Sequence, residues 1–103
     1  MKFLAMEHEM PNVSGSDFKP HLKAEALRVW ELYQSGIFRE LYFDKNKHNA
    51  VIILECQDIK EADAYLQTLP LVKAGLISFE IVELEPYSGF ARLFEDVSKG
   101  RFC

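Results

Sequence analysis

A histidine at the end of the first apolar segment is the residue best suited to proton transfer in this sequence. The ordinary pKa of a histidine lies close to neutral, so His8 can accept and donate a proton near pH 7. Leu4 and Met6 share its side of the predicted strand, and the alternative is a partly buried, hydrogen-bonded histidine without a catalytic role. His21 and His48 have charged neighbours and are expected to be solvated.

Arg39 and Glu55 form the second candidate group. If the turn between Asp44 and Ala50 pairs its two strands about its middle, Arg39 lies opposite Glu55 on the same face. The pair is then either a cross-strand ion pair, which stabilises a hairpin by a few tenths to about 1 kcal/mol, or an arginine held in place to bind a substrate carboxylate through two hydrogen bonds. Parallel pairing of the first and third strands would bring His8 to the same cleft.

Aromatic side chains at helical and strand spacing are candidates for a pocket wall. Trp30 and Tyr33 lie on the first predicted helix, and Phe38 and Tyr42 lie on the strand after it. They either line an apolar pocket with a phenolic donor or belong to the core. No two histidines stand at metal-ligand spacing, and no phosphate loop, nucleophile motif or dinucleotide fingerprint is present. We therefore expect neither a metal nor a cofactor.

Length and charge limit the remaining possibilities. The chain has 103 residues, of which 49% are hydrophobic, and this predicts one globular domain over residues 1–103. A net charge of -4 disfavours nucleic acid and anionic membrane surfaces as partners. No apolar run approaches the roughly 18 residues of a membrane span, and the start turns acidic at Glu7, so we expect a cytoplasmic protein. Cys56 is expected to be a small buried hydrophobic residue, and a disulfide with Cys103 is not expected.

Hydrophobic periodicity and turn residues predict the elements that must position these side chains. Asp17 can cap the first helix by accepting hydrogen bonds from its first backbone N–H groups, Pro20 suits the first turn, and Gly36 suits a left-handed residue that ends the helix. Asp58 and Glu61 have capping-box spacing at the start of the second helix. The predicted strands are 2–10, 37–44, 50–56 and 76–84, and the predicted helices run from Asp17 to about Ser35 and from Asp58 to Leu69.

The order of these elements predicts an α+β fold. Strand, helix, strand, strand, helix, strand is the ferredoxin-like βαββαβ arrangement, an antiparallel four-stranded sheet in the order 4-1-3-2 with both helices on one face. The strands are apolar on both sides, so the uncovered face is expected to be buried by a partner, with a homodimer as the simplest solution. Residues 1–86 form the predicted core. Residues 87–103 form a C-terminal arm with Phe90, Leu93, Phe94 and Phe102, which either packs on its own subunit or reaches across to another.

The segment 36–43 (GIFRELYF), the strand around Ala50, and the turn Leu69-Pro70-Leu71 before the last strand resemble the muconolactone delta-isomerase-like family of the dimeric α+β barrel superfamily. The resemblance covers about residues 23–87 and implies two sheets packed face to face and a pocket between the helices and the sheet. That family typically has Trp-Arg-His-Leu-Trp-Arg after the glycine. Only Arg39 carries over, because Glu40 and Phe43 replace the histidine and the second arginine.

Two functions from different classes follow. The first is a cofactor-free enzyme, an isomerase or a related small oxygenase, that isomerises a small unsaturated lactone or carbonyl compound. In it His8 carries the proton, and the substrate contacts Arg39, Glu55, Tyr42, Trp30 and Tyr33. The second is a non-catalytic homodimer that binds a small hydrophobic ligand or a protein partner. Assembly beyond a dimer and the identity of the small organic molecule stay open in both.

Overall fold

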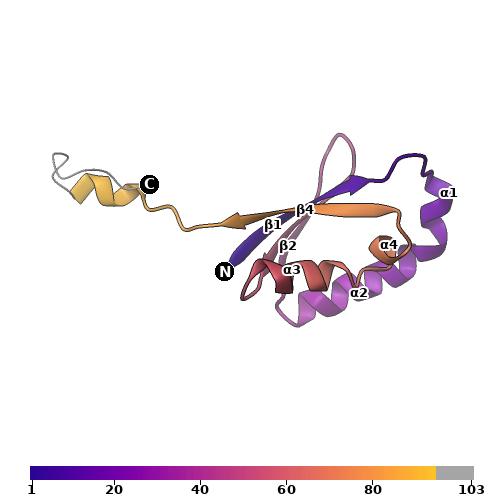
Figure 1. The fold of residues 1–103 in the computed structure, drawn as a ribbon, viewed down its shortest axis with the longest axis horizontal. Helices are drawn as coiled ribbons and strands as arrows, with labels where there is room; N and C mark the ends of the chain where they lie inside the picture. The colour runs from indigo at the N-terminus through magenta and orange to yellow at the C-terminus, as the bar shows by residue number, and fades with distance from the viewer. Residues whose placement is uncertain (95–103) are drawn as a thin grey trace.

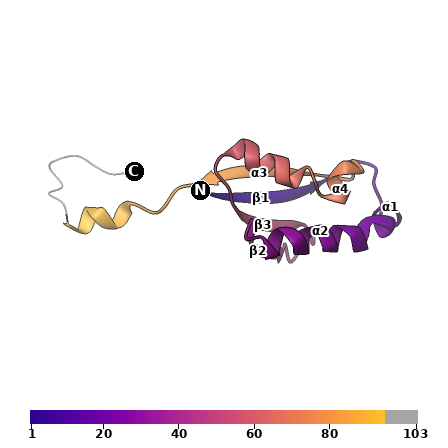
Figure 2. The same cartoon turned by 90° about the horizontal axis from the view of Figure 1, so that it is seen from below.

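The computed structural model describes residues 1–94, and its central feature is a four-stranded antiparallel sheet. The strands are β1 (Lys2–Glu9), β2 (Phe38–Phe43), β3 (Ala50–Glu55) and β4 (Ile77–Leu84), in the order β2-β3-β1-β4. The helical segments between the strands lie along one side of the sheet (Figures 1 and 2). This is the predicted α+β arrangement, with the sheet order 4-1-3-2 confirmed.

The first connection contains three helical segments where the sequence predicted one helix. They are α1 (Gly15–Phe18), the 3-10 turn η1 (Lys19–His21) and α2 (Leu22–Gln34). The predicted cap at Asp17 is wrong: Ser14 is the N-cap, and Asp17 lies inside the first turn, where its carboxylate accepts a hydrogen bond from the backbone N–H of Ser14 at 2.8 Å. Pro20 lies in the 3-10 turn that joins α1 to α2. Gly36 ends the helix with a φ of +83°, as predicted, because this backbone conformation favours glycine.

The second connection also divides, into α3 (Ile59–Leu66) and α4 (Pro70–Lys73). Asp58 caps α3 by accepting a hydrogen bond from the backbone N–H of Glu61 at 2.8 Å, which confirms the predicted helix start. Pro70 was predicted to close this helix after Leu69, but α3 already ends at Leu66. Pro70 instead begins α4, because proline suits the first position of a helix, where its missing N–H is not needed.

The pairing of β1 corrects one step of the sequence interpretation. β1 and β3 are antiparallel, so Lys2 pairs with Glu55 and Met6 pairs with Val51. The prediction of parallel pairing was wrong because β3 follows β2 through a hairpin and must run opposite to it, while the helical crossover makes β1 and β2 run the same way. His8 consequently lies at the far end of β1 from Glu55 and pairs with Ser78 of β4.

Alternation along the strands separates two faces. On the helix side the buried positions of three strands meet α2, α3 and α4 in one apolar core. Its fully buried large side chains are Phe3, Phe38, Leu54, Leu66 and Leu69. Cys56 is also buried there, as predicted, and burial raises the pKa of its thiol. The helices thus cover one face of the sheet, which we call the covered face.

The other face, which we call the open face, has no helix over it among residues 1–94 (Figure 1). Its apolar side chains are half-buried or exposed, including Leu4, Met6, Val51, Ile53, Val82 and Leu84. β3 is central, as predicted, but within this subunit its side chains are buried on the covered face only. The open face is therefore an apolar surface at the level of one chain.

Residues after β4 leave the body of the molecule. The segment 85–94, which we call the arm, ends in the 3-10 helix η2 (Gly89–Phe94) and points away from the sheet and helices in both views (Figures 1 and 2). Its side chains Phe90, Leu93 and Phe94 are exposed, so the arm does not pack on its own subunit. Phe102 and Cys103 lie outside the described residues. No helix among residues 1–94 has the length and apolar character needed to cross a membrane.

Candidate functional site: a carboxylate-bearing cavity on the covered face

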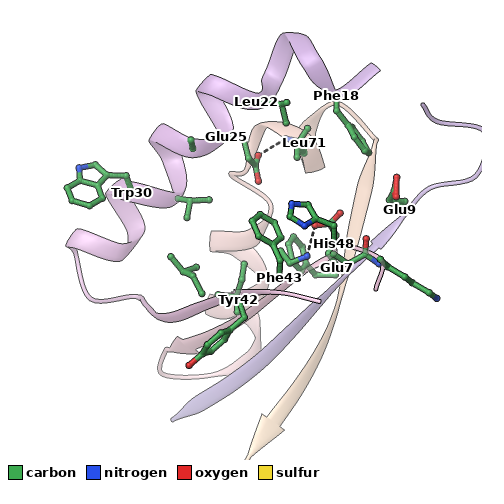
Figure 3. Close-up of a pocket in the computed structure, with 18 of the residues that line it drawn as sticks. Glu7, Glu9, Phe18, Leu22, Glu25, Trp30, Tyr42, Phe43, His48 and Leu71 are labelled. Carbon is green, nitrogen blue, oxygen red and sulfur yellow. Dashed lines mark hydrogen bonds between the residues drawn. The ribbon is translucent and has the colours of Figure 1, made fainter. Parts of the chain in front are cut away.

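A cavity of about 830 Å³ lies between α2 and the covered face of the sheet (Figure 3). Volumes of this size accommodate small organic ligands. Its wall is mostly apolar, with Phe18, Leu22 and Val29 on the helical side and Ile52 and Phe79 on the sheet. The predicted pocket between the helices and the sheet is therefore present, and the question becomes which polar groups point into it.

Glu25 supplies the first polar group. It lies one turn into α2, and its carboxylate points toward the cavity (Figure 3). Its Oε1 accepts a hydrogen bond of 2.9 Å from the backbone N–H of Leu71, the second residue of α4. This bond ties α2 to α4 and fixes the carboxylate. Burial raises the pKa of Glu25, the bond from Leu71 opposes that rise, and the nearby charge of Glu7 adds to it.

Glu7 supplies the second group, from the sheet. Its Oε1 accepts a hydrogen bond of 2.9 Å from the backbone N–H of Ala50, the first residue of β3. Burial raises the pKa of Glu7, while the bond from Ala50 lowers it and Glu9 raises it. Each carboxylate thus uses one oxygen to bind the backbone, and its other oxygen has no hydrogen-bond partner among residues 1–94.

These two half-buried carboxylates can exchange protons with a ligand. A raised pKa brings a carboxyl group closer to neutral pH, where it can serve as a general base when ionised and as a general acid when protonated. The charge of Glu7 adds a smaller contribution to the raised pKa of Glu25, after burial and the opposing hydrogen bond from Leu71. The cavity therefore holds two carboxyl groups with raised pKa values within a mostly apolar wall.

The β2–β3 hairpin brings a histidine to the same cavity. His48 has a φ of +60°, and its ring stacks on Phe43 with 4.0 Å between centroids. The turn is fixed by Asp44, whose Oδ1 accepts hydrogen bonds from the backbone N–H groups of Asn46 at 2.7 Å and Lys47 at 2.8 Å. His48 is exposed, as predicted, but it also lines the cavity. Its charge, when present, lowers the pKa of Glu7.

Three of the four predicted pocket aromatics lie at the cavity. Trp30, Tyr33 and Tyr42 are lining residues, whereas Phe38 is fully buried in the core. The Tyr42 ring turns away from the cavity (Figure 3). Its hydroxyl donates a hydrogen bond of 2.7 Å to Glu40. Contact of these three side chains with a substrate stays a prediction.

His8, Arg39 and Glu55 are not among the residues that line the cavity. His8 is on the open face, 59% exposed, with its Nε2 3.2 Å from Glu80 Oε1. Glu55 binds the amino group of Met1 and lies 3.7 Å from Lys2 Nζ. The structure does not bring His8 together with Glu55, because their strands pair antiparallel.

A bulge in β2 explains the position of Arg39. Phe38 pairs with Leu54 and Glu40 pairs with Ile53, so Arg39 is the extra residue and has no partner directly opposite. The predicted register, which placed Arg39 opposite Glu55, is wrong: the hairpin pairs Phe43 with Ala50, one residue away from that register, and the bulge shifts it by one more, so that Glu55 donates its backbone N–H to Ile37. Arg39 donates a hydrogen bond to the carbonyl of Gly36, and its charge still contributes to lowering the pKa of Glu55. The predicted contacts of Arg39 and Glu55 with a substrate stay predictions.

Glu7 and Glu25 were not singled out from the sequence, although the pattern contains a signal for both. Alternation puts Glu7 on the same side of β1 as the buried Phe3 and Ala5. Helical spacing puts Glu25 between Leu22 and Val29 on the apolar stripe of α2. A carboxylate in line with buried positions is unusual, and here it marks the cavity.

Among residues 1–94 no group of three His, Cys, Asp or Glu side chains is arranged to hold a metal ion. The polar residues of the cavity wall include two carboxylates held by backbone N–H groups, a third carboxylate at Glu9, and Lys19, Lys47, His48 and Asn49. This donor set suits proton transfer to and from an organic ligand.

Comparisons with known proteins show a shared fold. The chain matches no family model, and no curated protein matches it in sequence. It is similar in structure to a muconolactone isomerase, with a TM-score of 0.71, 16% identity, and coverage of 85% of this chain and 92% of that one. It is also similar to a 5-chloro-2-hydroxyhydroquinone dehydrochlorinase from Burkholderia phenoliruptrix in complex with 2,5-dihydroxybenzoquinone, with a TM-score of 0.61, 18% identity, and coverage of 82% and 94%. The predicted resemblance is thus confirmed for the fold: this chain has the α+β fold of muconolactone isomerase.

Proposed function

We propose that the protein is a small-molecule enzyme whose active site is the covered-face cavity, and that it moves a proton within a small unsaturated lactone or carbonyl compound. The observation that carries the proposal is the pair of half-buried carboxylates, Glu7 and Glu25, whose pKa values burial raises inside a mostly apolar wall. Such a pair is what an isomerisation without a cofactor needs.

The reaction we propose has two proton transfers. The ionised carboxylate accepts a proton from a carbon next to the carbonyl group, and the electron pair of the broken C–H bond moves toward the carbonyl oxygen. The protonated carboxyl group donates a hydrogen bond to that oxygen and stabilises its growing charge. The first carboxyl group then returns the proton to the other end of the conjugated system. The double bond has moved, both carboxyl groups regain their starting state, and no co-reactant is consumed.

The fold neighbours support a small-molecule enzyme. One is an isomerase named for a lactone, and the other is a dehydrochlorinase named for a hydroxylated ring and bound to a dihydroxyquinone. At 16% and 18% identity, these likenesses support the superfamily but do not choose the substrate. We take the unsaturated lactone as the substrate class because its isomerisation uses the two carboxylates of the cavity and nothing else.

The open face supports a homodimer in this proposal. Leu4, Ile53 and Val82 come from three different strands and share this face, so a second sheet placed against it would remove a continuous apolar surface from water. The dimer would leave both cavities, on the covered faces, available to ligand. Location in the cytoplasm stays part of the proposal.

The roles predicted for His8 and Arg39 do not enter this reaction. His8 is on the open face and Arg39 is held at the bulge by Gly36, so both are outside the cavity wall. A catalytic His8 would require a ligand on the open face. That alternative is tested together with the main proposal below.

The test is isomerisation of a simple five-membered unsaturated lactone, followed by NMR in deuterium oxide as double-bond migration and incorporation of deuterium. We expect turnover by the wild type and a loss of 10²-fold or more, about what general acid-base catalysis supplies, when the base is changed. Glu7→Gln and Glu25→Gln are compared, because an amide can donate a hydrogen bond but cannot accept the proton. The variant with the larger loss identifies the base.

The matched control is Glu80→Gln, which changes an exposed glutamate on the open face. It should keep full turnover. Binding of lactones without turnover by the wild type would contradict the enzyme and support the non-catalytic binding module. Equal activity of Glu7→Gln, Glu25→Gln and wild type, with loss in His8→Gln, would move the site to the open face.

A further inference from the structure

We propose that the charged ring of His48 holds Glu7 in its ionised form, which makes Glu7 the base and Glu25 the acid of the covered-face cavity. His48 is then a positioning residue that acts through Glu7. The inference rests on the reaction proposed above and deepens it, because that reaction leaves the roles of the two carboxyl groups unassigned. The link between His48 and Glu7 can be measured without a ligand.

The backbone of His48 has a conformation that side chains rarely adopt. Its φ is +60°, and Asn12 is the only other residue besides glycine with a positive φ among residues 1–94. Glycine adopts this conformation without strain, whereas other residues pay free energy for it, and such positions cluster at functional sites. The turn alone thus does not require a histidine at position 48.

Three contacts connect the ring of His48 to the carboxylate of Glu7. The ring stacks on Phe43 with 4.0 Å between centroids and 16° between the ring planes. Phe43 pairs with Ala50 across the hairpin, and the backbone N–H of Ala50 donates a hydrogen bond of 2.9 Å to Glu7 Oε1. Figure 3 shows His48, Phe43 and Glu7 in the same part of the cavity. The hairpin therefore carries both the histidine and the N–H group that fixes the carboxylate.

Hydrogen bonds within the turn hold His48 in this place. Its backbone N–H donates a bond of 2.8 Å to the carbonyl of Asp44, and the N–H of Asp44 donates one of 2.7 Å to the carbonyl of Asn49. The Asp44 carboxylate accepts two further bonds from the turn. Because the turn fixes the backbone and Phe43 orients the ring, the charge of His48 acts on Glu7 from one position.

Charges of both signs surround Glu7. Burial is the largest influence on its pKa and raises it, and the hydrogen bond from Ala50 lowers it. Among the neighbouring charges, Glu9 raises this pKa, while His48 and, more weakly, His8 lower it. The other charged residues that line the cavity are Glu25 on α2, Lys19 in η1 and Lys47 in the hairpin. His8 is on the open face, so His48 is the histidine that shares the cavity with Glu7.

Glu25 has a negative charge as its nearest strong influence from a side chain. Burial raises its pKa most, the bond from Leu71 lowers it, and the charge of Glu7 raises it, while His21 lowers it more weakly. Ionised Glu7 therefore helps Glu25 to keep its proton. The carboxyl group that ionises first can accept a proton from the ligand, and the group that keeps its proton can donate a hydrogen bond.

Histidine substitutions in the full-length protein test this assignment. The pKa values of Glu7 and Glu25 are measured by NMR titration of their side-chain carboxyl carbons. His48→Asn removes the charge and introduces a residue that tolerates a positive φ. It should raise the pKa of Glu7 and change that of Glu25 less, because loss of a nearby positive charge favours the protonated carboxyl group. His48→Lys should restore the lower pKa, since it returns a charge without the ring.

The matched control is His21→Asn, because His21 acts on Glu25 and does not line the cavity. It should raise the pKa of Glu25 and leave that of Glu7 unchanged. An unchanged pKa of Glu7 in His48→Asn, or equal shifts of both carboxyl groups, would overturn the proposal. A His48→Lys variant that behaves like His48→Asn would overturn it too, because the ring and not the charge would then matter.

Turnover of the lactone tests the consequence for the reaction. If Glu7 is the base, its ionisation sets the acid limb of the pH profile, so His48→Asn should move that limb to higher pH, with a loss of about 2-fold or more on the limb and none above it. Glu7→Gln should lose more turnover than Glu25→Gln, and the reverse order would overturn the assignment. Absence of turnover in the wild type would contradict the proposed reaction and the base, whereas the titration still decides whether His48 acts on Glu7.

Discussion

The covered face and the open face of the same sheet carry charged groups in opposite ways. On the covered face, Glu7 and Glu25 are half-buried, each bound to a backbone N–H, and burial raises the pKa of both. On the open face, His8 and Glu55 are exposed or half-exposed and pair with other charged groups, and hydrogen bonding to the amino group of Met1 lowers the pKa of Glu55.

This difference between the two faces indicates where proton transfer to a ligand can occur. Exposed charge pairs contribute little, because water screens them and solvates both partners. Burial of a charged carboxylate in an apolar wall costs free energy. This cost raises the pKa of the carboxyl group toward neutral pH. The residue types that look most chemical in the sequence, a histidine and an arginine, are on the open side or at its edge, while two ordinary glutamates occupy the cavity.

The largest predicted difference between the faces is the loss of stability when neighbouring residues of β3 are changed to alanine. Leu54 is fully buried on the covered face, and Ile53 is half-buried on the open face. Leu54→Ala should lower the free energy of unfolding by about 2–5 kcal/mol at any protein concentration. Ile53→Ala should cost about 1 kcal/mol in the dilute monomer and weaken self-association at higher concentration. Urea unfolding at two protein concentrations measures both, and equal costs in dilute protein would contradict the distinction.

A smaller effect concerns the helices that make the covered face. Asp58 accepts a hydrogen bond from the backbone N–H of Glu61 at the start of α3, so Asp58→Ala should lower the free energy of unfolding by about 1 kcal/mol. Asp63→Ala is the control, because Asp63 is exposed in the middle of the same helix. Thermal unfolding followed by circular dichroism compares them. A control that loses as much stability as Asp58→Ala would rule out capping as the cause.

The two faces should also respond oppositely to pH. The folded-state pKa of Glu25 is raised, so its contribution to stability is largest below the ordinary value of 4.5 and is lost as pH rises through the raised pKa. Glu55 has a lowered pKa, so its contribution is present above 4.5 and is lost as pH falls.

Neutral substitutions test this opposition. At pH 7, Glu25→Gln should be as stable as wild type or more stable, whereas Glu55→Gln should be less stable. At low pH the differences from wild type should shrink in both variants, because the wild-type carboxyl groups are then protonated. Urea midpoints measured from pH 3 to pH 7 give the comparison. The idea fails if both variants shift in the same direction at pH 7.

The smallest effect is expected for His8. Its pair with Glu80 is exposed on both sides, so His8→Gln should change the free energy of unfolding by less than about 1 kcal/mol. It should also leave turnover of the lactone unchanged. Turnover is the decisive readout, because its loss in His8→Gln with an unchanged fold would show that the open face carries the chemistry.

The sequence was sufficient for the order of elements. Alternation in β4, the glycine after α2 and the Asp58–Glu61 spacing are local signals, and the structure confirms each of them. The direction of β1 relative to β3 was deducible from the same order but was assigned wrongly. The Arg39–Glu55 pairing was harder to predict, because the hairpin register differs by one residue from the assumed one and the bulge at Arg39 adds another, and no local pattern specifies the bulge.

Glu7 and Glu25 illustrate the other limit. Each occupies a position that periodicity assigns to the buried side, but their partners are backbone N–H groups of Ala50 and Leu71, more than forty residues away. Only the assembled fold brings these donors to the carboxylates. A residue type that is common on surfaces therefore became a candidate for catalysis through long-range contacts that spacing alone does not reveal.

The most direct test of the cavity as the functional site is an NMR titration of the uniformly ¹⁵N-labelled protein with the unsaturated lactone. The backbone N–H groups of Ala50 and Leu71 bind Glu7 and Glu25, so their signals report on the two carboxylates. The account predicts that both signals shift with one common dissociation constant, while those of Ser78 and Glu80 on the open face stay in place. Shifts confined to Ser78 and Glu80 would contradict it.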